Sequence, residues 1–318
     1  MTSLDATTRQ ATAPPGEMPA LPPAAARANL ITVGAAHAVL HGVSILMPLI
    51  FPILHDRYGF SYTQIGLIGT ASSLAGGILQ VVFGYLSRVI PRKVLIGAGN
   101  LVVAVATMLT ATGTTFAPWL GWSVLRGVGA APQHPAGNSI LTDSYGTSRR
   151  GFAIAAHVAG GNVGTLLVPI VGATIIARFG WQPALIVFAL PGVAAGSAVL
   201  LFTREPPLPP REVTPAATVT NTPGRRRRSF GAGVAELIAP LRHRGVILVI
   251  CASMVAAGGR GLGILTKYLP LYLTGPIHLA APTVTGLYTL LLAGSVVGPP
   301  PGGRLAPPPG GPPVGGGG

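Results

Sequence analysis

Long apolar stretches without a charged side chain divide the sequence. The clearest of these stretches cover residues 28–55, 58–87, 94–125, 151–177 and 179–203. Each is long enough to cross a bilayer, because a spanning helix needs about 20 apolar residues at a rise of about 1.5 Å per residue. The flanking charges bound eight predicted spans, at 29–54, 64–86, 94–113, 117–140, 151–177, 182–202, 246–270 and 282–298. We therefore expect an all-α polytopic membrane protein, in which a six-helix amino-terminal bundle is followed by two helices of a second bundle.

The segments outside the spans differ in composition and divide the chain into five parts. We expect a disordered cytosolic tail at 1–28, a six-span membrane domain at 29–202, a linker at 203–244, a partial second membrane domain at 245–298 and a Pro/Gly tail at 299–318. In the stretch 298–318, 17 of 21 residues are Gly or Pro, so it can neither form a spanning helix nor bury apolar surface. The second bundle is therefore expected to be truncated after two spans.

The few charged residues are unevenly distributed between the two sides of the predicted membrane domain. The chain has 21 Lys and Arg residues against 7 Asp and Glu residues, which gives a net charge of +14. Basic residues gather after the second, fourth and sixth spans, at Arg88, Arg92, Lys93, Arg149, Arg150, Arg204, Arg211 and Arg225 to Arg228. Because cytoplasmic loops carry an excess of Lys and Arg, the amino terminus and the linker are predicted to be cytoplasmic. The positive charge then reflects membrane topology, and no nucleic-acid partner is expected.

Polar side chains at membrane depth are the candidate site residues. All seven acidic residues fall outside the predicted spans, so no buried carboxylate is available there as a proton carrier. The polar candidates inside the spans are His37, His41, Gln80, Arg126, His134, Asn162 and Arg260. An Arg at the centre of a span costs about 2.5–3.5 kcal/mol on insertion scales, so it normally faces a cavity or a partner. Arg126 and Arg260 are therefore the strongest candidates for ligand contact.

His37 and His41 are four residues apart and share one face of the first span. They form either a proton-responsive or substrate-binding pair, since imidazole titrates at about pH 6.5, or a neutral pair hydrogen-bonded to neighbouring helices. A metal site needs a third ligand, and no acid or second thiol is in reach, so we predict neither a metal nor a cofactor. His134 precedes Pro135, where a structural role in a broken helix and substrate contact are equally consistent with the sequence.

Several motifs occur in an order that resembles one family of membrane proteins. The first span contains HAVLH, from His37 to His41, before a proline-punctuated apolar helix. The fourth span contains RGVGAAPQHPAG and the fifth contains AGGNVGTLLVPIVG. Together they resemble the major facilitator superfamily, and within it the fosmidomycin-resistance branch, over residues 30–200 and more loosely over 244–305.

A further motif lies between the second and third spans. The segment GYLSRVIPRK resembles the superfamily's cytoplasmic loop motif, which implies a gating role for Gly84, Arg88, Arg92 and Lys93. Arg88 stands where the motif has an Asp, and Pro91 stands where it has a Gly.

The resemblance implies a secondary active transporter that works by alternating access and exports a small drug-like molecule. In the superfamily the first, fourth and seventh spans line the substrate cavity, and here these spans carry His37, His41, Arg126, His134 and Arg260. A basic cavity without acids favours an anionic or amphiphilic anionic substrate. The implied partners are this small molecule, the lipid bilayer and, as a further candidate, protons. The implied state is a monomer that spans the cell membrane several times.

Two other functions stay open. A truncated fragment that inserts into the membrane without transporting is consistent with the Pro/Gly tail. A metal-dependent intramembrane enzyme that uses the histidines is disfavoured, because no carboxylate is available as a general base. We therefore expect a transporter and no enzyme.

Overall fold

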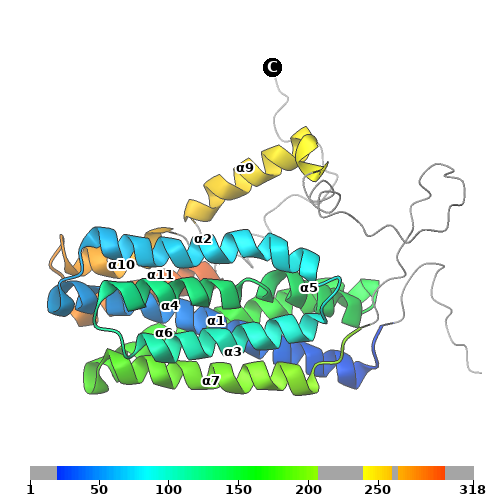
Figure 1. Cartoon of the computed structure of the whole chain (residues 1–318), viewed down its shortest axis with the longest axis horizontal. Coiled ribbons are helices and arrows are strands. Elements are labelled where there is room, and N and C mark those ends of the chain that lie inside the picture. Colours follow the sequence, from blue (N-terminus) through cyan, green and yellow to red (C-terminus); the bar gives the residue numbers. More distant parts are fainter. Residues whose placement is uncertain (1–19, 207–238, 260–263, 298–318) are drawn as a thin grey trace, which may run out of the picture.

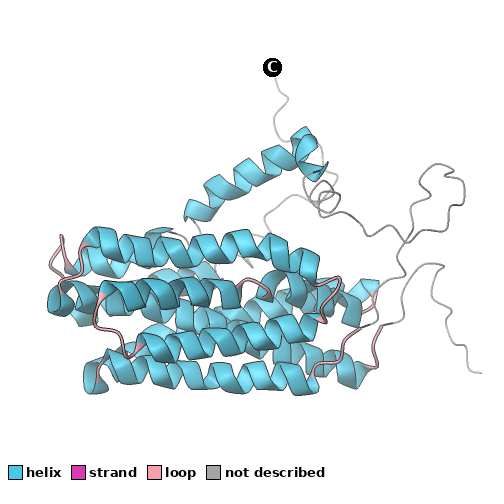
Figure 2. Ribbon diagram, in the orientation of Figure 1, coloured by secondary structure: helices cyan, strands magenta, loops and turns pink. Residues whose placement is uncertain are grey.

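The computed structural model describes residues 20–206, 239–259 and 264–297 (Figure 1). Its α-helices are α1 (Pro23–Tyr58), α2 (Tyr62–Leu86), α3 (Arg92–Thr110), α4 (Phe116–Ala130), α5 (Gln133–Ser144), α6 (Arg150–Phe179), α7 (Trp181–Phe202), α9 (Arg244–Gly259), α10 (Ile264–Thr274) and α11 (Ala281–Val297). Two short 3-10 helices are η1 (Thr147–Arg149) and η2 (Ala239–Arg242). No strand occurs in these ranges (Figure 2). The all-α prediction is confirmed.

Five helical segments are long and apolar enough to cross a membrane. They cover Pro23–Tyr58, Tyr62–Leu86, Arg92–Thr110, Thr147–Phe179 and Trp181–Phe202. These segments correspond to the first, second, third, fifth and sixth predicted spans. Large apolar side chains point outward from them, for example Leu74, which is 59% exposed, and Leu201, which is 73% exposed. A contiguous apolar exterior is unfavourable in water and is favourable against lipid.

α1 is longer than the first predicted span at both ends. It begins at Pro23, because a proline in the first turn has a helical φ and lacks an N–H that would go unpaired. It ends at Tyr58, because the next residue, Gly59, has a φ of +68°, the left-handed conformation that terminates helices. The tail predicted over 1–28 therefore ends too late, since residues from 23 onward are helical. Residues 1–19 lie outside the described part of the chain.

The fourth predicted span, 117–140, is not one continuous helix. α4 ends at Ala130 and α5 begins at Gln133. Pro132 and Pro135 lie at this junction, where a proline removes a backbone donor and its ring clashes with the preceding turn. Apolar composition located this span and the His134-Pro135 pair allowed a broken helix, and the structure has the break between Ala130 and Gln133.

Two described helices, α9 and α10, cover most of the seventh predicted span, 246–270. α9 begins at Arg244, at the end of the predicted linker, and α10 ends at Thr274. Residues 260–263 between these helices lie outside the described part, as do 207–238 of the linker and 298–318 of the Pro/Gly tail. The eighth predicted span, 282–298, corresponds to α11.

α1 lies at the centre of the bundle and packs along α6, α7 and α10. α3 packs against α4 and α7, α2 against α4, and α11 against α6. The main core joins buried side chains of α1, including Leu46, Ile50 and Phe51, to Trp119 and Trp181. α9 lies apart from the bundle (Figure 1). The first helices beyond the linker that reach the bundle are therefore α10 and α11, and a cavity lies where they meet it.

One end of the bundle collects the basic segments. The Leu21 N–H donates to the Ser144 carbonyl over 3.2 Å, and the Asn29 amide donates to the Ser144 hydroxyl and to the Arg204 carbonyl. The beginning of α1 therefore lies beside the ends of α5 and α7. Arg92, at the beginning of α3, is bonded to the same end of α5. The basic loops after α2, α5 and α7 thus share one end, as a positive-inside topology requires.

Candidate functional site: a basic cavity with a histidine cluster

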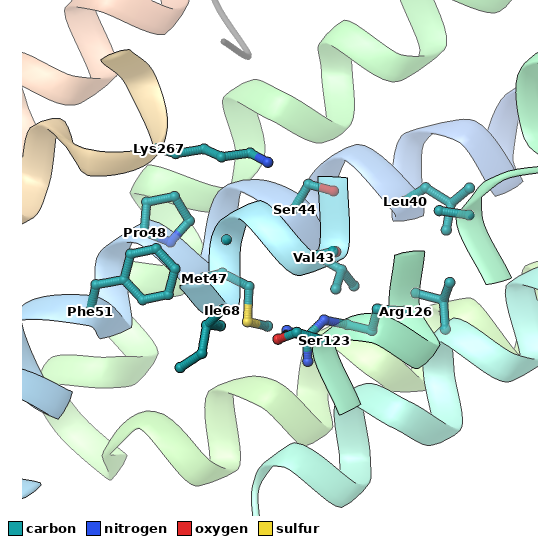
Figure 3. Close-up of a pocket in the computed structure, with 14 residues that line it drawn as sticks. Leu40, Val43, Ser44, Met47, Pro48, Phe51, Ile68, Ser123, Arg126 and Lys267 are labelled. Atoms are coloured by element: carbon teal, nitrogen blue, oxygen red, sulfur yellow. The ribbon is translucent and has the colours of Figure 1, made fainter. Parts of the chain in front are cut away.

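A cavity of about 340 Å³ lies among α1, α2, α4, α5, α10 and α11. Its polar lining consists of His37, His41, Ser44, Ser72, Ser73, Gln80, Gln133, His134, Thr266, Lys267 and Tyr288. A smaller pocket of about 90 Å³ shares several of these residues, including Ser44, Ser72 and Lys267, and reaches Arg126 (Figure 3). The helices from before and after the linker together enclose a space large enough for a small molecule.

Arg126 of α4 lines the smaller pocket and is only 6% exposed. Its Nη1 donates to the Thr110 hydroxyl and its Nη2 to the Ser123 hydroxyl, each over 2.6 Å. Within the described part of the chain, no carboxylate forms an ion pair with it. Guanidinium offers five N–H donors, so neutral hydroxyls leave its charge uncompensated and some of its donors available.

Lys267 of α10 is the second cation of this pocket, and the sequence analysis did not select it. Its ammonium donates to the Ser73 hydroxyl, which in turn donates to the Gly69 carbonyl over 2.9 Å. Figure 3 shows Lys267 and Arg126 on opposite sides of the pocket. The signal was present in the sequence, because a Lys inside the predicted 246–270 span is as unusual as an Arg.

Three histidines meet in the larger cavity. The His37 ring centroid lies 4.4 Å from that of His41 and 5.1 Å from that of His134. One ring nitrogen of each lies within 4.8 Å of those of the other two. His157 of α6 stacks on His37 with a centroid distance of 4.2 Å. The structure thus joins His134 to the predicted pair, and the proton-responsive role of that pair stays a prediction.

The first residue of α5 positions His134 beside α1. Gln133 is 1% exposed, and its amide donates to the Val33 carbonyl of α1 over 3.2 Å. Its carbonyl oxygen accepts from the Asn100 amide of α3, also over 3.2 Å. The break between α4 and α5 thus lets Gln133 bond to two neighbouring helices and fixes the adjacent histidine in the cavity.

The other candidates in the spans occupy different positions. Gln80 of α2 lines the larger cavity with the histidines. Asn162 lies on α6 and is not among the residues that line either pocket. Arg260 lies outside the described residues.

The predicted gating motif lies at the end of the bundle that carries the basic loops. Gly84, Arg88 and Arg92 line a pocket with Ser139 and Asp143. The Lys93 backbone N–H, at the same end, donates to Glu205 over 3.1 Å. Arg88 is exposed and lies over the Tyr85 ring, 6.0 Å from its centroid. The motif's residues therefore contact α5 and the segment after α7.

Arg92 forms a buried ion-pair cluster. It is 1% exposed and donates to Glu205 over 2.6 Å and to Asp143 over 2.5 Å. It also donates to the Ser139 hydroxyl over 2.7 Å and to the Pro206 carbonyl over 3.0 Å. Asp143, expected just beyond the fourth span, lies in the last turn of α5. The cluster joins α3, α5 and the exit from α7.

Comparison with known proteins identifies relatives of this chain. Residues 34–316 match the profile of the family described as the Major Facilitator Superfamily. Over 155 residues the chain is 30% identical to an uncharacterised MFS-type transporter, YfnC, of Bacillus subtilis (strain 168). This match covers 48% of this chain and 37% of that protein. Over 148 residues it is 28% identical to the fosmidomycin resistance protein of Escherichia coli (strain K12). This match covers 46% of this chain and 36% of that protein. The chain therefore spans little more than a third of these relatives.

A solved structure confirms the fold. The chain resembles the crystal structure of a bacterial homologue of the human lysosomal transporter Spinster, in an inward-facing and unoccupied conformation, with a TM-score of 0.67 and 18% identity. The similarity covers 89% of this chain and 63% of that one. The resemblance predicted from the motifs is thus confirmed at the level of family and fold.

Proposed function

Because the chain belongs to the Major Facilitator Superfamily, we propose that it serves in secondary active transport of a small anionic molecule, with the cavity as the binding site. The observation that supports the anionic substrate is the pairing of Arg126 and Lys267 in one pocket, with no carboxylate in its lining. Two cations near one another in a partly dehydrated site repel, and an anion between them removes this repulsion. Arg also offers two parallel N–H donors to a carboxylate or a phosphonate.

The position of the pocket favours transport. Arg126 lies on α4 before the linker and Lys267 on α10 after it, so one anion would contact both parts of the chain. In alternating access the two halves of a transporter rock about a site near the middle of the membrane. A ligand held by both halves biases this motion, because it binds best where both cations reach it.

Catalysis is the weaker proposal. Neither pocket has a carboxylate in its lining that would serve as a general base. An apolar wall and a few hydroxyls suit reversible binding, as an alternating-access carrier requires.

The proposed direction is export of an anionic or amphiphilic compound, by analogy with the fosmidomycin resistance protein. We place the protein in the cell membrane with the amino terminus in the cytoplasm, because Arg88, Arg92, Arg149 and Arg204 share one end of the bundle. The monomeric state belongs to the same proposal.

Anion binding to the purified full chain in detergent is the direct test. Small phosphonates and carboxylates are compared with their uncharged methyl esters, with ligand-dependent thermal stabilisation as the readout. A ligand at 100 times its Kd stabilises by about 2.7 kcal/mol. We expect stabilisation by the acids and not by the esters, its loss in Arg126→Leu and its partial reduction in Lys267→Gln. Arg178→Leu, at an exposed residue on α6, is the matched control. Equal stabilisation by acids and esters, unchanged in the two pocket variants, would contradict the proposal.

Cysteine labelling tests the orientation. Cys251 is the one cysteine of the chain and is exposed, so Cys251→Ser supplies the background. Val89, 75% exposed between α2 and α3, and Thr114, between α3 and α4, lie at opposite ends of α3. On intact cells an impermeant maleimide is expected to label Thr114→Cys and to leave Val89→Cys unlabelled until the cells are opened. The reverse pattern would invert the topology.

A further inference from the structure

The hydrogen bonds of His37 and His41 leave one nitrogen of each ring available as a ligand. His37 Nδ1 lies 3.0 Å from the His157 carbonyl, which can only accept, so Nδ1 carries the proton and Nε2 the lone pair. This Nε2 is buried without a hydrogen-bond partner, and the side chain is 3% exposed. An unpartnered acceptor in a buried position is costly unless something fills it.

His41 repeats this arrangement with a hydroxyl. Its Nδ1 lies 3.1 Å from the Thr165 hydroxyl, which itself donates to the Gly161 carbonyl over 3.2 Å. Because the hydroxyl proton is directed to Gly161, the oxygen accepts from His41 Nδ1–H, and Nε2 again carries the lone pair. A ring N–H bonded to a carbonyl or a similar acceptor is the usual second-shell arrangement of metal-ligating histidines.

His134 supplies the third ligand. It lines the cavity with His37 and His41, and its imidazole lies with theirs in a cluster whose ligand atoms are within 4.8 Å of one another. A metal with N ligands at about 2.0–2.1 Å brings tetrahedral ligand atoms to about 3.3 Å, so small rotations of the rings complete the site. No metal was predicted from the sequence because no acid or second thiol is in reach as a third ligand, and the kink before α5 provides an imidazole instead.

We propose that His37, His41 and His134 bind one divalent transition-metal ion in the cavity, with an open coordination position toward the cavity. Three neutral imidazoles suit Zn²⁺, Co²⁺, Ni²⁺ or Cu²⁺, and the absence of a carboxylate from this lining disfavours Mg²⁺ and Ca²⁺. The bound ion occupies the space beside the unpartnered His37 nitrogen. The described lining of this cavity holds no carboxylate to offset the charge of the ion, so the open position favours an anion as the fourth ligand. This metal site does not depend on the proposed transport function.

Cobalt binding tests the site. The full chain is purified in detergent through a tag without histidine, and Co²⁺ is titrated while its visible ligand-field absorption and the bound stoichiometry are recorded. We expect one Co²⁺ per chain with the spectrum of a nitrogen-ligated tetrahedral or five-coordinate ion, and displacement by Zn²⁺. Loss of a second-shell partner costs about 10–100-fold in metal affinity, so loss of a ligand in His134→Gln is expected to cost at least about 100-fold.

Two further variants separate ligation from folding. His134→Gln changes an exposed side chain and is expected to keep the thermal unfolding midpoint. Thr165→Val removes the hydroxyl that accepts from His41 Nδ1 but no proposed ligand, and it is expected to weaken Co²⁺ binding about 10-fold. His243→Gln, at an exposed histidine outside the cavity, is the matched control and is expected to bind as the wild type does. Equal affinity in the wild type and His134→Gln, or no saturable binding by folded wild type, would show a cluster of neutral packed histidines and overturn the proposal.

Discussion

Arg92 and Arg126 are both buried, and they differ in what compensates their charge. Arg92 is 1% exposed and contacts two carboxylates, those of Asp143 and Glu205. Arg126 is 6% exposed, and within the described ranges its guanidinium donates to the hydroxyls of Thr110 and Ser123 and forms no ion pair. Burial of a charge is expensive unless an opposite charge or a set of dipoles replaces water. At Arg92 two carboxylates of the protein replace the lost water. At Arg126 two hydroxyls replace it only in part.

The difference separates a structural arginine from a binding arginine. The Arg92 cluster joins three parts of the bundle and lies at the end that carries the basic loops. Arg126 faces a pocket that also contains Lys267, and a ligand can supply there the negative charge that the described residues do not. Loss of Arg92 should therefore reduce stability, and loss of Arg126 should reduce binding.

The largest effect is expected for Arg92→Leu. Removal of one partner of a buried ion pair costs about 3–5 kcal/mol, because the other partner is left without its counter-charge. Asp143 is 20% and Glu205 26% exposed, so water reaches both and the expected loss is about 3 kcal/mol, the lower end of this range. The measurement is the thermal unfolding midpoint of the purified protein. Arg88→Leu, four residues away and exposed, is the control and is expected to change stability by less than about 0.5 kcal/mol. Equal destabilisation by both would remove the special role of Arg92.

The next effect is expected for Arg126, measured as anion affinity. Arg126→Lys keeps the charge but loses the two parallel donors, and Arg126→Leu loses both. We expect Arg126→Lys to insert normally and to weaken binding about 100-fold, or about 2.7 kcal/mol, and Arg126→Leu to abolish measurable binding. Thermal stability of the unliganded protein should change little. A large loss of stability with unchanged affinity would place Arg126 in the same class as Arg92.

A smaller loss of affinity is expected for Lys267→Gln. Lys267 is half-buried, so water screens part of its interaction with an anion. The expected weakening is about 10-fold, or about 1.4 kcal/mol, and it should decrease at high salt more than the Arg126 effect does. Binding titrations at low and high ionic strength measure both quantities, with Arg178→Gln as the control. An unchanged affinity in Lys267→Gln would leave Arg126 as the pocket's only cation for the ligand.

Much of the fold could be predicted from the sequence, because membrane spans are set by length and apolar composition. Each predicted span corresponds to one helix or to two consecutive helices. The order of the motifs indicates the family. The kinks could not be placed in this way. A proline in an apolar stretch is compatible with a continuous bent helix or with two helices, and only contacts such as those of Gln133 decide between them.

The site was less predictable, because it depends on which faces meet. Spacing placed His37 and His41 on one face, but only tertiary packing adds His134 and stacks His157 on them. Arg92 was expected in a cytoplasmic loop motif, and its burial follows from contacts with two acids far apart in the sequence, Asp143 and Glu205. Contacts between residues so far apart in the sequence leave no pattern in the residues around each of them.

The last expected effect compares the loss of one hydroxyl at each arginine. The Ser123 hydroxyl oxygen accepts from Arg126 over 2.6 Å and is fully buried, whereas the Ser139 hydroxyl oxygen accepts from Arg92 over 2.7 Å and is half-buried. A hydrogen bond to a charged group contributes about 1.5–3 kcal/mol, but Arg92 keeps two carboxylates when Ser139 is lost. We expect Ser123→Ala to lower the free energy of unfolding by about 1.5 kcal/mol, and Ser139→Ala by clearly less.

The two serine variants also respond differently to ligand. A saturating anion compensates Arg126 directly, so it should narrow the difference in unfolding midpoint between Ser123→Ala and the wild type. The same anion has no contact with Arg92, so the difference between Ser139→Ala and the wild type should stay constant. If the anion changed the difference in unfolding midpoint equally for both variants, it would stabilise the bundle without contacting Arg126. The two buried arginines would then differ only in their protein partners.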